Sequence, residues 1–413
     1  MMRDHISSLR AACARGARRL IGEERGAGVI WFAAFTLVAL LGGTIVIDYG
    51  DIVVERRDQQ KSADAIVLAG VQELPEETLL ADQFAREWGL RNGVDPTEIV
   101  DLTLDASCWS SHPDDDPLVL DSISTDISRP ANMFLLREFG IGFNVGAHAK
   151  GCVGSLIETT GLRPWSVSIF NSECFSLTGG NAANVLDYEP QYGQRCVIRL
   201  ESPSSQVGSI RLGDEPGDDC SPPGGGASAY KENIVEGSDA LCAIGEIIAT
   251  EPGLQVGPTF TAVEDMLALE GACDTNPNFG NTNGYDELLE VFTANPSDVA
   301  PGPNTIFTPR NCGWDTDPGT PDSPRFVTLV LIDQFDKPNG FDTEPIIAFA
   351  GFFIEGCEVV EGDGSLTAYP QCDMKNSDRA NAQIVGTFVQ HLKLGGAAGV
   401  LNPFGTRTYA LVE

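Results

Sequence analysis

The histidines are the first residues to examine for chemistry, and only four occur in the 413 residues. They are His5, His112, His148 and His391, and none stands at a zinc-binding spacing from a cysteine or glutamate. The chain also lacks a Gly-x-Ser-x-Gly elbow, a Walker loop and a Gly-x-Gly-x-x-Gly fingerprint. Gly224-Gly225-Gly226 follows two prolines, so flexibility explains it better than phosphate binding. We predict no enzyme, no catalytic residue and no cofactor; a Ser, His and Asp triad assembled only by the fold stays open.

Acidic turns are the second candidates, because carboxylates and amide oxygens bind calcium. Asp274-Thr275-Asn276-Pro277-Asn278-Phe279-Gly280 places oxygens at alternating positions, as an EF-hand loop does. Phe279 stands where that loop needs glycine, and Pro277 interrupts it. Other acidic turns lie at residues 114–116 and 361–364. Solvated turns in an acidic chain explain all of these better, so we predict no metal site and keep calcium as the alternative.

The cysteines indicate disulfide bonds rather than a metal site. Of 11 cysteines, Cys13 alone precedes the long apolar stretch described below. The other ten are Cys108, Cys152, Cys174, Cys196, Cys220, Cys242, Cys273, Cys312, Cys357 and Cys372. No Cys-x-x-Cys pair is present, and an even number in an exported region predicts up to five bridges. The sequence does not fix the pairing, although short loop closure favours pairs such as Cys220–Cys242 and Cys357–Cys372.

The residues from 27 to 47 form an uncharged stretch, AGVIWFAAFTLVALLGGTIVI, whose only polar side chains are Thr36 and Thr44. At about 1.5 Å per residue, a helix of this length spans roughly 30 Å, the hydrocarbon thickness of a bilayer. It has no polar face, which distinguishes it from a buried helix of a soluble protein. A cleaved signal peptide is the alternative, but no small-x-small site follows. We predict a retained transmembrane helix.

The charges give its orientation. Six arginines precede the stretch, against three acidic residues, and short arginine-rich flanks stay in the cytoplasm. We predict a cytoplasmic N-terminus and an extracytoplasmic remainder. The whole chain has 26 Lys+Arg and 59 Asp+Glu, a net charge of −33, and most of the acidic excess follows the stretch. An exported domain this acidic is not expected to bind nucleic acid or anionic head groups.

A second helix is predicted from residue 52 to residue 74, extending the membrane helix outward. Two series of residues recur there at spacings of three and four. The first series is Ile52, Glu55, Gln59, Ala63, Ile66 and Gly70, and the second is Val53, Arg57, Lys61, Asp64 and Leu68. Ala63, Ala65 and Ala69 would allow another helix to approach closely. Gly50 weakens helix formation, so the sequence leaves open whether the two helices are continuous.

Three motifs in this region resemble a known family. Glu24-Arg25-Gly26 precedes the apolar stretch, Asp48-Tyr49-Gly50 ends it, and a Gln-x-x-Ala-Asp-Ala pattern begins at Gln60. In order and spacing they resemble the N-terminal module of the TadE/TadG-like Flp pilus-assembly proteins. Ile66 and Val67 depart from the alanines usual there. The resemblance covers about 50 residues at the N-terminal end.

Two features known from that family are not predicted here. Cleavage as a prepilin requires a glutamate at the fifth mature position, whereas cleavage after Gly22 or Gly26 would place Ala27 or Trp31 there. A von Willebrand A domain requires Asp-x-Ser-x-Ser after a strand. The best strand-to-aspartate candidate, which ends at Asp333, continues Gln334-Phe335-Asp336.

The remaining chain predicts an α+β fold, because 45 Gly and 25 Pro favour loops and strands over a helical bundle. Helices are predicted at 76–90, at 227–250 with an interruption at Gly237-Ser238, and at 261–269. Predicted strands are 99–104, 143–148, 166–170, 196–200, 208–212, 326–332, 346–354, 382–392 and 409–411, and loops are 213–226, 274–284 and 295–324. The predicted organisation is a basic cytoplasmic segment (1–26), a transmembrane helix (27–47), a juxtamembrane helix (48–75) and a large disulfide-bonded, strand-rich exported domain (76–413).

The resemblance implies a non-enzymatic role in a Flp/Tad-type pilus assembly or secretion system. The membrane and juxtamembrane helices would pack with other pilus-assembly or pseudopilin proteins, and the acidic domain would be displayed outside. The first alternative is a surface-anchored adhesin or ligand-binding protein, with calcium as a candidate ligand. An exported hydrolase is the second alternative.

Overall fold

The computed structural model describes most of the chain in segments. They are residues 24–75, 77–109, 118–131, 133, 136–140, 142–170, 172–192, 194–198, 207–223, 226–251, 256–268, 306–307, 324–334, 342–369, 371–392, 396–404 and 406–412. Two compact units are present. Unit 1 consists of Met1–Ile66, Arg86–Leu102 and Thr125–Ala149, and unit 2 of Val67–Ala85, Thr103–Ser124 and Lys150–Glu413. The fold is α+β, with a long apolar helix followed by strand-rich structure, as predicted.

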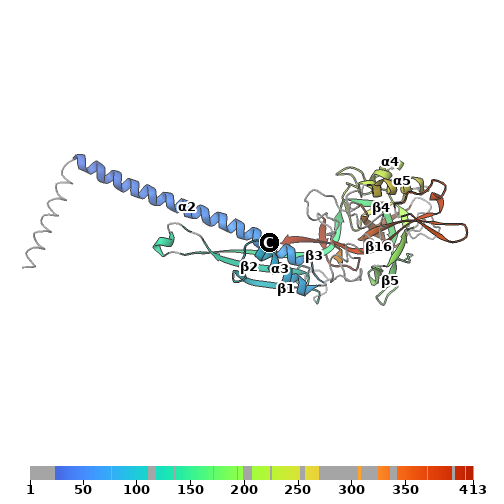
Figure 1. The fold of residues 1–413 in the computed structure, drawn as a ribbon, viewed down its shortest axis with the longest axis horizontal. Coiled ribbons are helices and arrows are strands. Elements are labelled where there is room, and N and C mark those ends of the chain that lie inside the picture. The colour runs from blue at the N-terminus through green and yellow to red at the C-terminus, as the bar shows by residue number, and fades with distance from the viewer. Residues whose placement is uncertain are drawn as a thin grey trace, which may run out of the picture. The chain divides into compact units, whose positions relative to one another are not determined.

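Helix α2 (Glu24–Val71) is continuous over 48 residues (Figure 1). The predicted membrane and juxtamembrane helices are therefore one helix, and Gly50 lies inside it without a break. No atom would come within 4 Å of a Cβ added at Gly50, so this position of the helix faces open space. A turn at residues 72–75 ends the helix.

One face of α2 is covered by the protein itself, and it carries the first of the two series found in the sequence. Asp48, Gln59, Ala63 and Ile66 are buried, and Ile52 and Glu55 lie half-buried between them. Members of the second predicted series, such as Arg57 and Lys61, are exposed. Ala63 is 0% exposed, so the protein itself covers this small residue.

Unit 1 contains most of α2 and one end of three neighbouring strands. The strands β1 (Ile99–Asp105), β2 (Ser122–Pro130) and β3 (Asn144–Thr159) are neighbours in that order, with the short helix η1 (Leu136–Phe139) between β2 and β3. Helix α3 (Thr78–Arg91) ends at Asn92-Gly93, as predicted, and Gly93 takes the left-handed conformation (φ +75°) that glycine favours. A Cβ at Gly89 of α3 would contact Ile66 and Ile99, which shows how closely helix and strand approach.

Unit 2 contains a mixed sheet whose main order is β3-β18-β16-β14-β12-β4-β8. Its remaining elements are β4 (Leu162–Ser168), β5 (Phe175–Leu177), η2 (Val185–Asp187), β6 (Tyr188–Pro190), β7 (Arg195–Ile198), β8 (Val207–Ser209), α4 (Ala227–Val235), β9 (Cys242–Ala243), β10 (Ile247–Ala249), α5 (Val256–Leu267), β11 (Ile306–Phe307), β12 (Phe326–Ile332), β13 (Thr343–Pro345), β14 (Ala348–Val360), β15 (Leu366–Tyr369), η4 (Arg379–Asn381), β16 (Ala382–Leu392), β17 (Ala397–Gly399) and β18 (Thr406–Val412). Strands β12 and β14 are antiparallel, whereas β12 and β4 are parallel.

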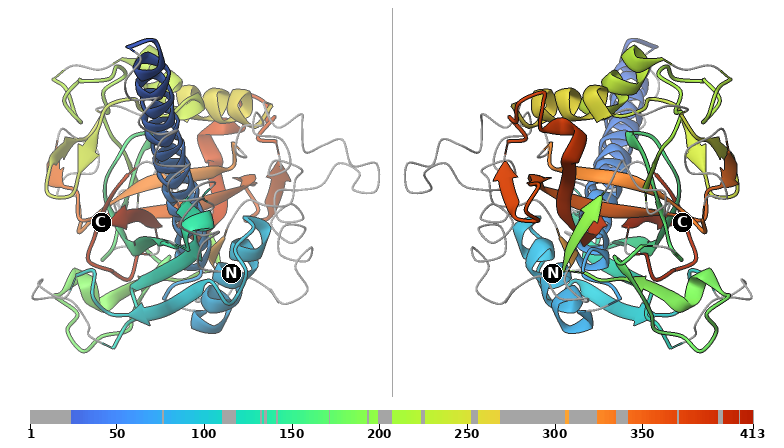
Figure 2. Two further views of the ribbon diagram at one scale, coloured as in Figure 1. Left: turned by 90° about the vertical axis from the view of Figure 1, so that its left-hand side faces the viewer. Right: turned by 90° about the vertical axis from the view of Figure 1, so that its right-hand side faces the viewer.

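Two apolar clusters cover the central strands of this sheet. The larger cluster includes Trp165, Phe352 and Phe388 from strands, together with Tyr230 of α4 and Phe260 of α5. Helices α4 and α5 pack side by side over these strands (Figure 2). The smaller cluster collects alternate residues of the same strands, including Val330 and Ile332 of β12. Because both faces are covered, β12 is a continuous apolar run, and this run made it predictable.

The prediction of helix from 227 to 250 is correct only in its first third. Helix α4 ends at Val235, and Gly237 then takes a left-handed conformation (φ +88°). The residues beyond form the short strands β9 and β10, which pair with β3 and β13. Helix α5 begins at Val256, earlier than the predicted residue 261, with Pro258 in its first turn, where proline is tolerated. Strand β2 was not predicted, and the predicted loop 274–284 lies outside the described residues.

Two glycines of α2 provide a test of how tightly the helix is held. A Cβ at Gly70 would lie 2.5 Å from Ile123 Cδ1 and 2.9 Å from the Ala81 carbonyl, whereas one at Gly50 meets nothing within 4 Å. Gly70→Ala should lower the free energy of unfolding by about 1–3 kcal/mol through overpacking. Gly50→Ala should raise it by up to about 1 kcal/mol because alanine favours the helix. Thermal unfolding of the full-length protein in detergent measures both variants, and equal shifts would contradict the packing described for Gly70.

Candidate functional site

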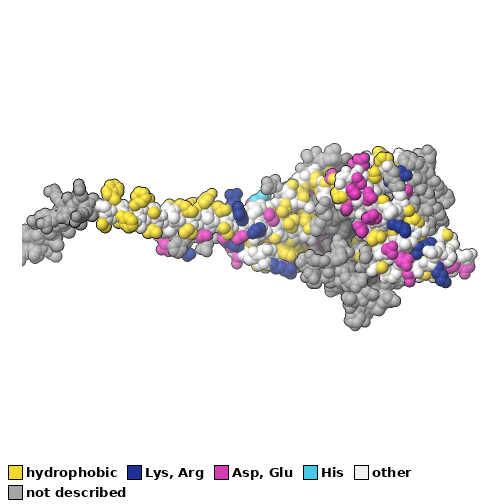
Figure 3. Space-filling model, turned by 90° about the horizontal axis from the view of Figure 1, so that it is seen from above, with side chains coloured by type: hydrophobic (Ala, Val, Ile, Leu, Met, Phe, Trp, Pro, Cys, Tyr) yellow, Lys and Arg dark blue, Asp and Glu magenta, His cyan; other side chains and the backbone are white. Residues whose placement is uncertain are grey.

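From Gly28 to Ile47, α2 is apolar, and none of these residues is buried. From residue 28 onward it is the one helix, among the described residues, that is long and apolar enough to cross a membrane, and none of its apolar window is buried. Figure 3 shows hydrophobic side chains along this helix. Its two polar side chains are satisfied internally, because Thr36 donates to the Phe32 carbonyl (2.8 Å) and Thr44 to the Leu41 carbonyl (2.9 Å). Such a helix can cross hydrocarbon without leaving a hydroxyl unpaired.

Further along the helix, unit 1 is held together by an arginine on β2. Arg129 forms a two-pronged pair with Glu98, with N–O distances of 2.9 and 2.8 Å. It also reaches Glu55 of α2 (3.3 Å) and donates to the Gly93 carbonyl (2.8 Å). The hydrogen bonds from Arg129 hold the pKa of Glu98 below its usual value, although burial acts in the opposite direction. This arginine therefore joins α2, the end of α3 and β2.

Gln60 makes a second polar link in unit 1. Its amide nitrogen donates to the His148 carbonyl on β3 (2.7 Å) and to Asp64 (2.9 Å). In the structure Asp64 is half-buried and accepts from Gln60. The His148 ring lies 3.0 Å from Asp126 in an exposed pair.

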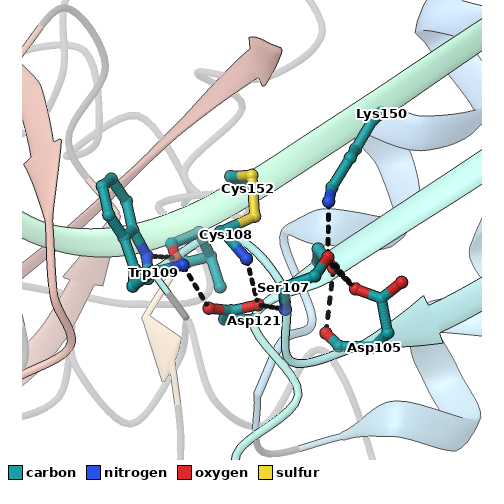
Figure 4. The surroundings of a disulfide bond; sticks show 9 residues. Asp105, Ser107, Cys108, Trp109, Asp121, Lys150 and Cys152 are labelled. Atoms are coloured by element: carbon teal, nitrogen blue, oxygen red, sulfur yellow. Dashed lines mark hydrogen bonds between the residues drawn. A yellow bond between two sulfur atoms is a disulfide. The ribbon is translucent and has the colours of Figure 1, made fainter. Parts of the chain in front are cut away.

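A second cluster surrounds the Cys108–Cys152 disulfide in unit 2 (Figure 4). Asp121, which is 1% exposed, accepts hydrogen bonds from three successive backbone N–H groups: Ser107 (2.9 Å), Cys108 (3.1 Å) and Trp109 (3.3 Å). The Trp109 indole donates to the Val153 carbonyl (2.9 Å). These bonds to Asp121 hold the backbone of residues 107–109 in one conformation.

The same cluster contains a serine next to a lysine, an arrangement that catalyses acyl transfer in some enzymes. Ser107 Oγ receives the Lys150 amine and is also bonded to Asp105, which accepts from Ser122 as well. Acyl transfer would further require N–H groups free to bind an oxyanion. The backbone N–H groups of residues 107 to 109 are instead engaged by Asp121. The arrangement can therefore hold a strand end but offers no oxyanion hole there.

Four disulfides lie in the described residues: Cys108–Cys152, Cys174–Cys196, Cys220–Cys242 and Cys357–Cys372. The two pairings favoured by short loops, Cys220–Cys242 and Cys357–Cys372, are confirmed. Cys13, Cys273 and Cys312 lie outside the described residues. Within the described chain, the one set of three potential metal ligands is Cys220, Cys242 and Glu246. Its two sulfurs are joined in a disulfide, so they are not thiolate ligands.

The predicted acidic turns can be located in part. In the turn at 361–364, Asp363 accepts from the Ser365 backbone N–H (2.9 Å) and hydroxyl (2.6 Å), and the hydroxyl bond lowers the pKa of Asp363. Glu361 accepts from Thr367 (3.0 Å). These carboxylates serve the turn itself. Residues 114–116, residues 274–280, His5 and His112 lie outside the described residues, and His391 lies on β16.

Comparison with known proteins gives a match for the long apolar helix α2. Residues 26–73 match the model of the putative Flp pilus-assembly TadE/G-like family. The match confirms the resemblance seen in the Glu-Arg-Gly, Asp-Tyr-Gly and Gln-x-x-Ala-Asp-Ala motifs. The matched segment, called the TadE/G-like segment below, nearly coincides with α2. No curated protein and no solved structure matches the chain.

The Asp105 carboxylate allows a test of the cluster around the disulfide. Burial raises its pKa, but the hydrogen bonds from Ser107 and Ser122 and the charge of Lys150 outweigh burial, so the pKa in the folded protein is lowered. The stabilisation is therefore complete above the unfolded pKa of about 4 and is lost as the pH falls through the folded pKa.

Asp105→Asn should cost about 1–2 kcal/mol of unfolding free energy at pH 7 and much less near pH 3. The control is Asp126→Asn, which alters an exposed carboxylate. Denaturant unfolding at the two pH values measures the difference between each variant and the wild type. A cost for Asp105→Asn that does not change with pH would show that its charge has no part in this cluster.

Proposed function

We propose that the protein is a non-enzymatic, single-pass membrane component of a Flp/Tad-type pilus assembly or secretion system. The observation that carries the proposal is the family match at residues 26–73, which falls on one continuous helix exposed on all sides over its apolar half. In this proposal residues 1–26 are a cytoplasmic segment, residues 27–47 cross the membrane, and residues 48–75 form a juxtamembrane helix. Residues 76–413 form an acidic domain outside the membrane.

Two features support this orientation. The arginine-rich flank before residue 27 favours a cytoplasmic N-terminus. The four disulfides of unit 2 favour an oxidising compartment for the other side. The acidic domain would then be anchored and displayed at the cell surface or in the envelope, while α2 contacts other pilus-assembly or pseudopilin proteins.

Cysteine labelling tests the orientation. In a Cys13→Ala background, Arg57→Cys introduces a thiol on the exposed face of α2 beyond the membrane, and Arg10→Cys introduces one before it. A membrane-impermeant maleimide applied to spheroplasts should label position 57 and should label position 10 only after permeabilisation. The unsubstituted background controls for the remaining cysteines. The reverse pattern of labelling would refute the proposed topology.

Photo-crosslinking tests the partners of α2. Val54 is 57% exposed on α2, and Leu366, on β15, is 53% exposed, so the two positions are matched in type and exposure. A photoreactive amino acid at position 54 should form adducts with other pilus-assembly proteins in cells, and the same group at position 366 should form few. Mass spectrometry identifies the adducts. Adducts with the same partners at both positions, or at neither, would show that α2 is not the contact surface.

A further inference from the structure

Arg163 is a buried cation in the middle of unit 2. It lies on β4, every residue of which is buried, and the side chain is 9% exposed. Trp165, two residues further along the strand, belongs to the larger apolar cluster, so the guanidinium lies beside an apolar interior. A charged group in such a position is expected to have a partner, because burying it unpaired costs several kcal/mol.

Within the described chain, no hydrogen-bond partner reaches the Nε or Nη1 of Arg163. No ion pair involving Arg163 is present there either, and burial lowers its pKa to about 10. Two other buried arginines donate to backbone carbonyls: Arg325 to those of Ile354 and Glu355 (both 3.0 Å), and Arg407, whose Nε is also unpaired among the described residues, to that of Leu74 (3.3 Å). Arg163 differs from both because two of its donor nitrogens are unpaired in the described chain.

Two glycines bring the backbone close to the guanidinium. Gly161 and Gly237 both have positive φ (71° and 88°), and a Cβ at Gly237 would lie 3.1 Å from Nη1 of Arg163 and 3.0 Å from the Gly161 Cα. Gly237 follows the C-terminal end of α4 (Figure 1), whose partial negative charge favours a cation. No carbonyl of this helix end accepts from Nε or Nη1, so the helix compensates the charge only in part.

We propose that Arg163 anchors a binding site for an oxyanion, a carboxylate or a phosphate, next to the C-terminal end of α4. The planar guanidinium presents its N–H donors in a fork that matches both groups. A carboxylate would come from a protein partner, whereas a phosphate would come from a small molecule. The site is independent of the pilus role, because it lies outside the TadE/G-like segment.

The test compares thermal unfolding of the full-length protein in detergent in sodium chloride, sodium acetate and sodium phosphate at equal ionic strength. Acetate or phosphate should raise the melting temperature of the wild type by about 2–4 °C relative to chloride. Arg163→Gln should abolish this rise and should be no less stable than the wild type in chloride. Arg211→Gln is the matched control, because Arg211 is already paired with Glu251 (2.7 Å) and its loss should leave the rise intact.

The outcomes separate the two ligand classes. A rise in acetate alone indicates a carboxylate, and a larger rise in phosphate indicates a phosphate group. An equal rise in the wild type and Arg163→Gln, or no rise in either anion, overturns the proposal. Should Arg163→Gln fail to fold, calorimetric titration of the wild type and Arg163→Lys with inorganic phosphate decides the question. Arg163→Lys keeps the charge but lacks the planar, forked guanidinium. Equal binding heats for the wild type and Arg163→Lys, or no heat for the wild type, would refute the proposed site.

Discussion

The narrow stripe of buried side chains on α2 is the constraint on which unit 1 depends. A helix of 48 residues is roughly 70 Å long, more than twice the hydrocarbon thickness of a bilayer. In the proposed topology its second half lies in water, where an isolated helix is only marginally stable. It is stabilised by burying one face, which begins at Asp48 and continues through Gln59 and Ala63. Before Asp48 the helix is exposed on every side, as a helix surrounded by lipid should be.

Polar contacts fix the position of this helix more than they stabilise it. The Arg129 and Glu98 side chains keep 33% and 21% exposure, so their pairing is worth little more than about 1 kcal/mol after solvent screening. The geometry of the pair is nevertheless specific, because a two-pronged guanidinium contact permits one arrangement of β2 and the turn after α3. The close packing of α3 on α2 at Gly89 and Ile66 buries apolar surface. Arg129 fixes how β2 is placed against α2 and the turn after α3.

The elements that were predicted correctly are those whose own residues decide the structure. Helix α2 has an uncharged stretch followed by a three-and-four spacing, and β12 has seven apolar or β-branched residues in succession. The helix predicted after Gly237 is wrong because distant contacts override the local pattern. Strands β9 and β10 form by pairing with strands far away in the sequence, and Cys242 is joined to Cys220 by a disulfide. Periodicity within one segment carries no information about such pairing.

The candidate sites show the same division. The TadE/G-like helix could be recognised because its motifs are contiguous. Arg129, Asp121 and Arg163 carried no sequence signal, since each acquires its role from residues far away in the chain. The position of Cys108 shortly after a predicted strand did not reveal that Asp121 would bind the backbone beside it. The Cys108–Cys152 bridge has a sequence separation of 44, compared with 15 for Cys357–Cys372, and so was not favoured by loop length.

Two different kinds of stabilisation meet in the cluster around Cys108. The Cys108–Cys152 bridge acts mainly by restricting the unfolded chain, an effect of about 4 kcal/mol for a loop of this length. Asp121 acts on the folded state alone, by satisfying three backbone N–H groups that would otherwise be unpaired. Trp109 adds a third contact, and it requires glycine at position 154, where a Cβ would lie 2.7 Å from the indole. Because each contact holds the same short segment in a different way, loss of one leaves the others in place, which suits a permanent connection between strands better than a moving catalytic loop.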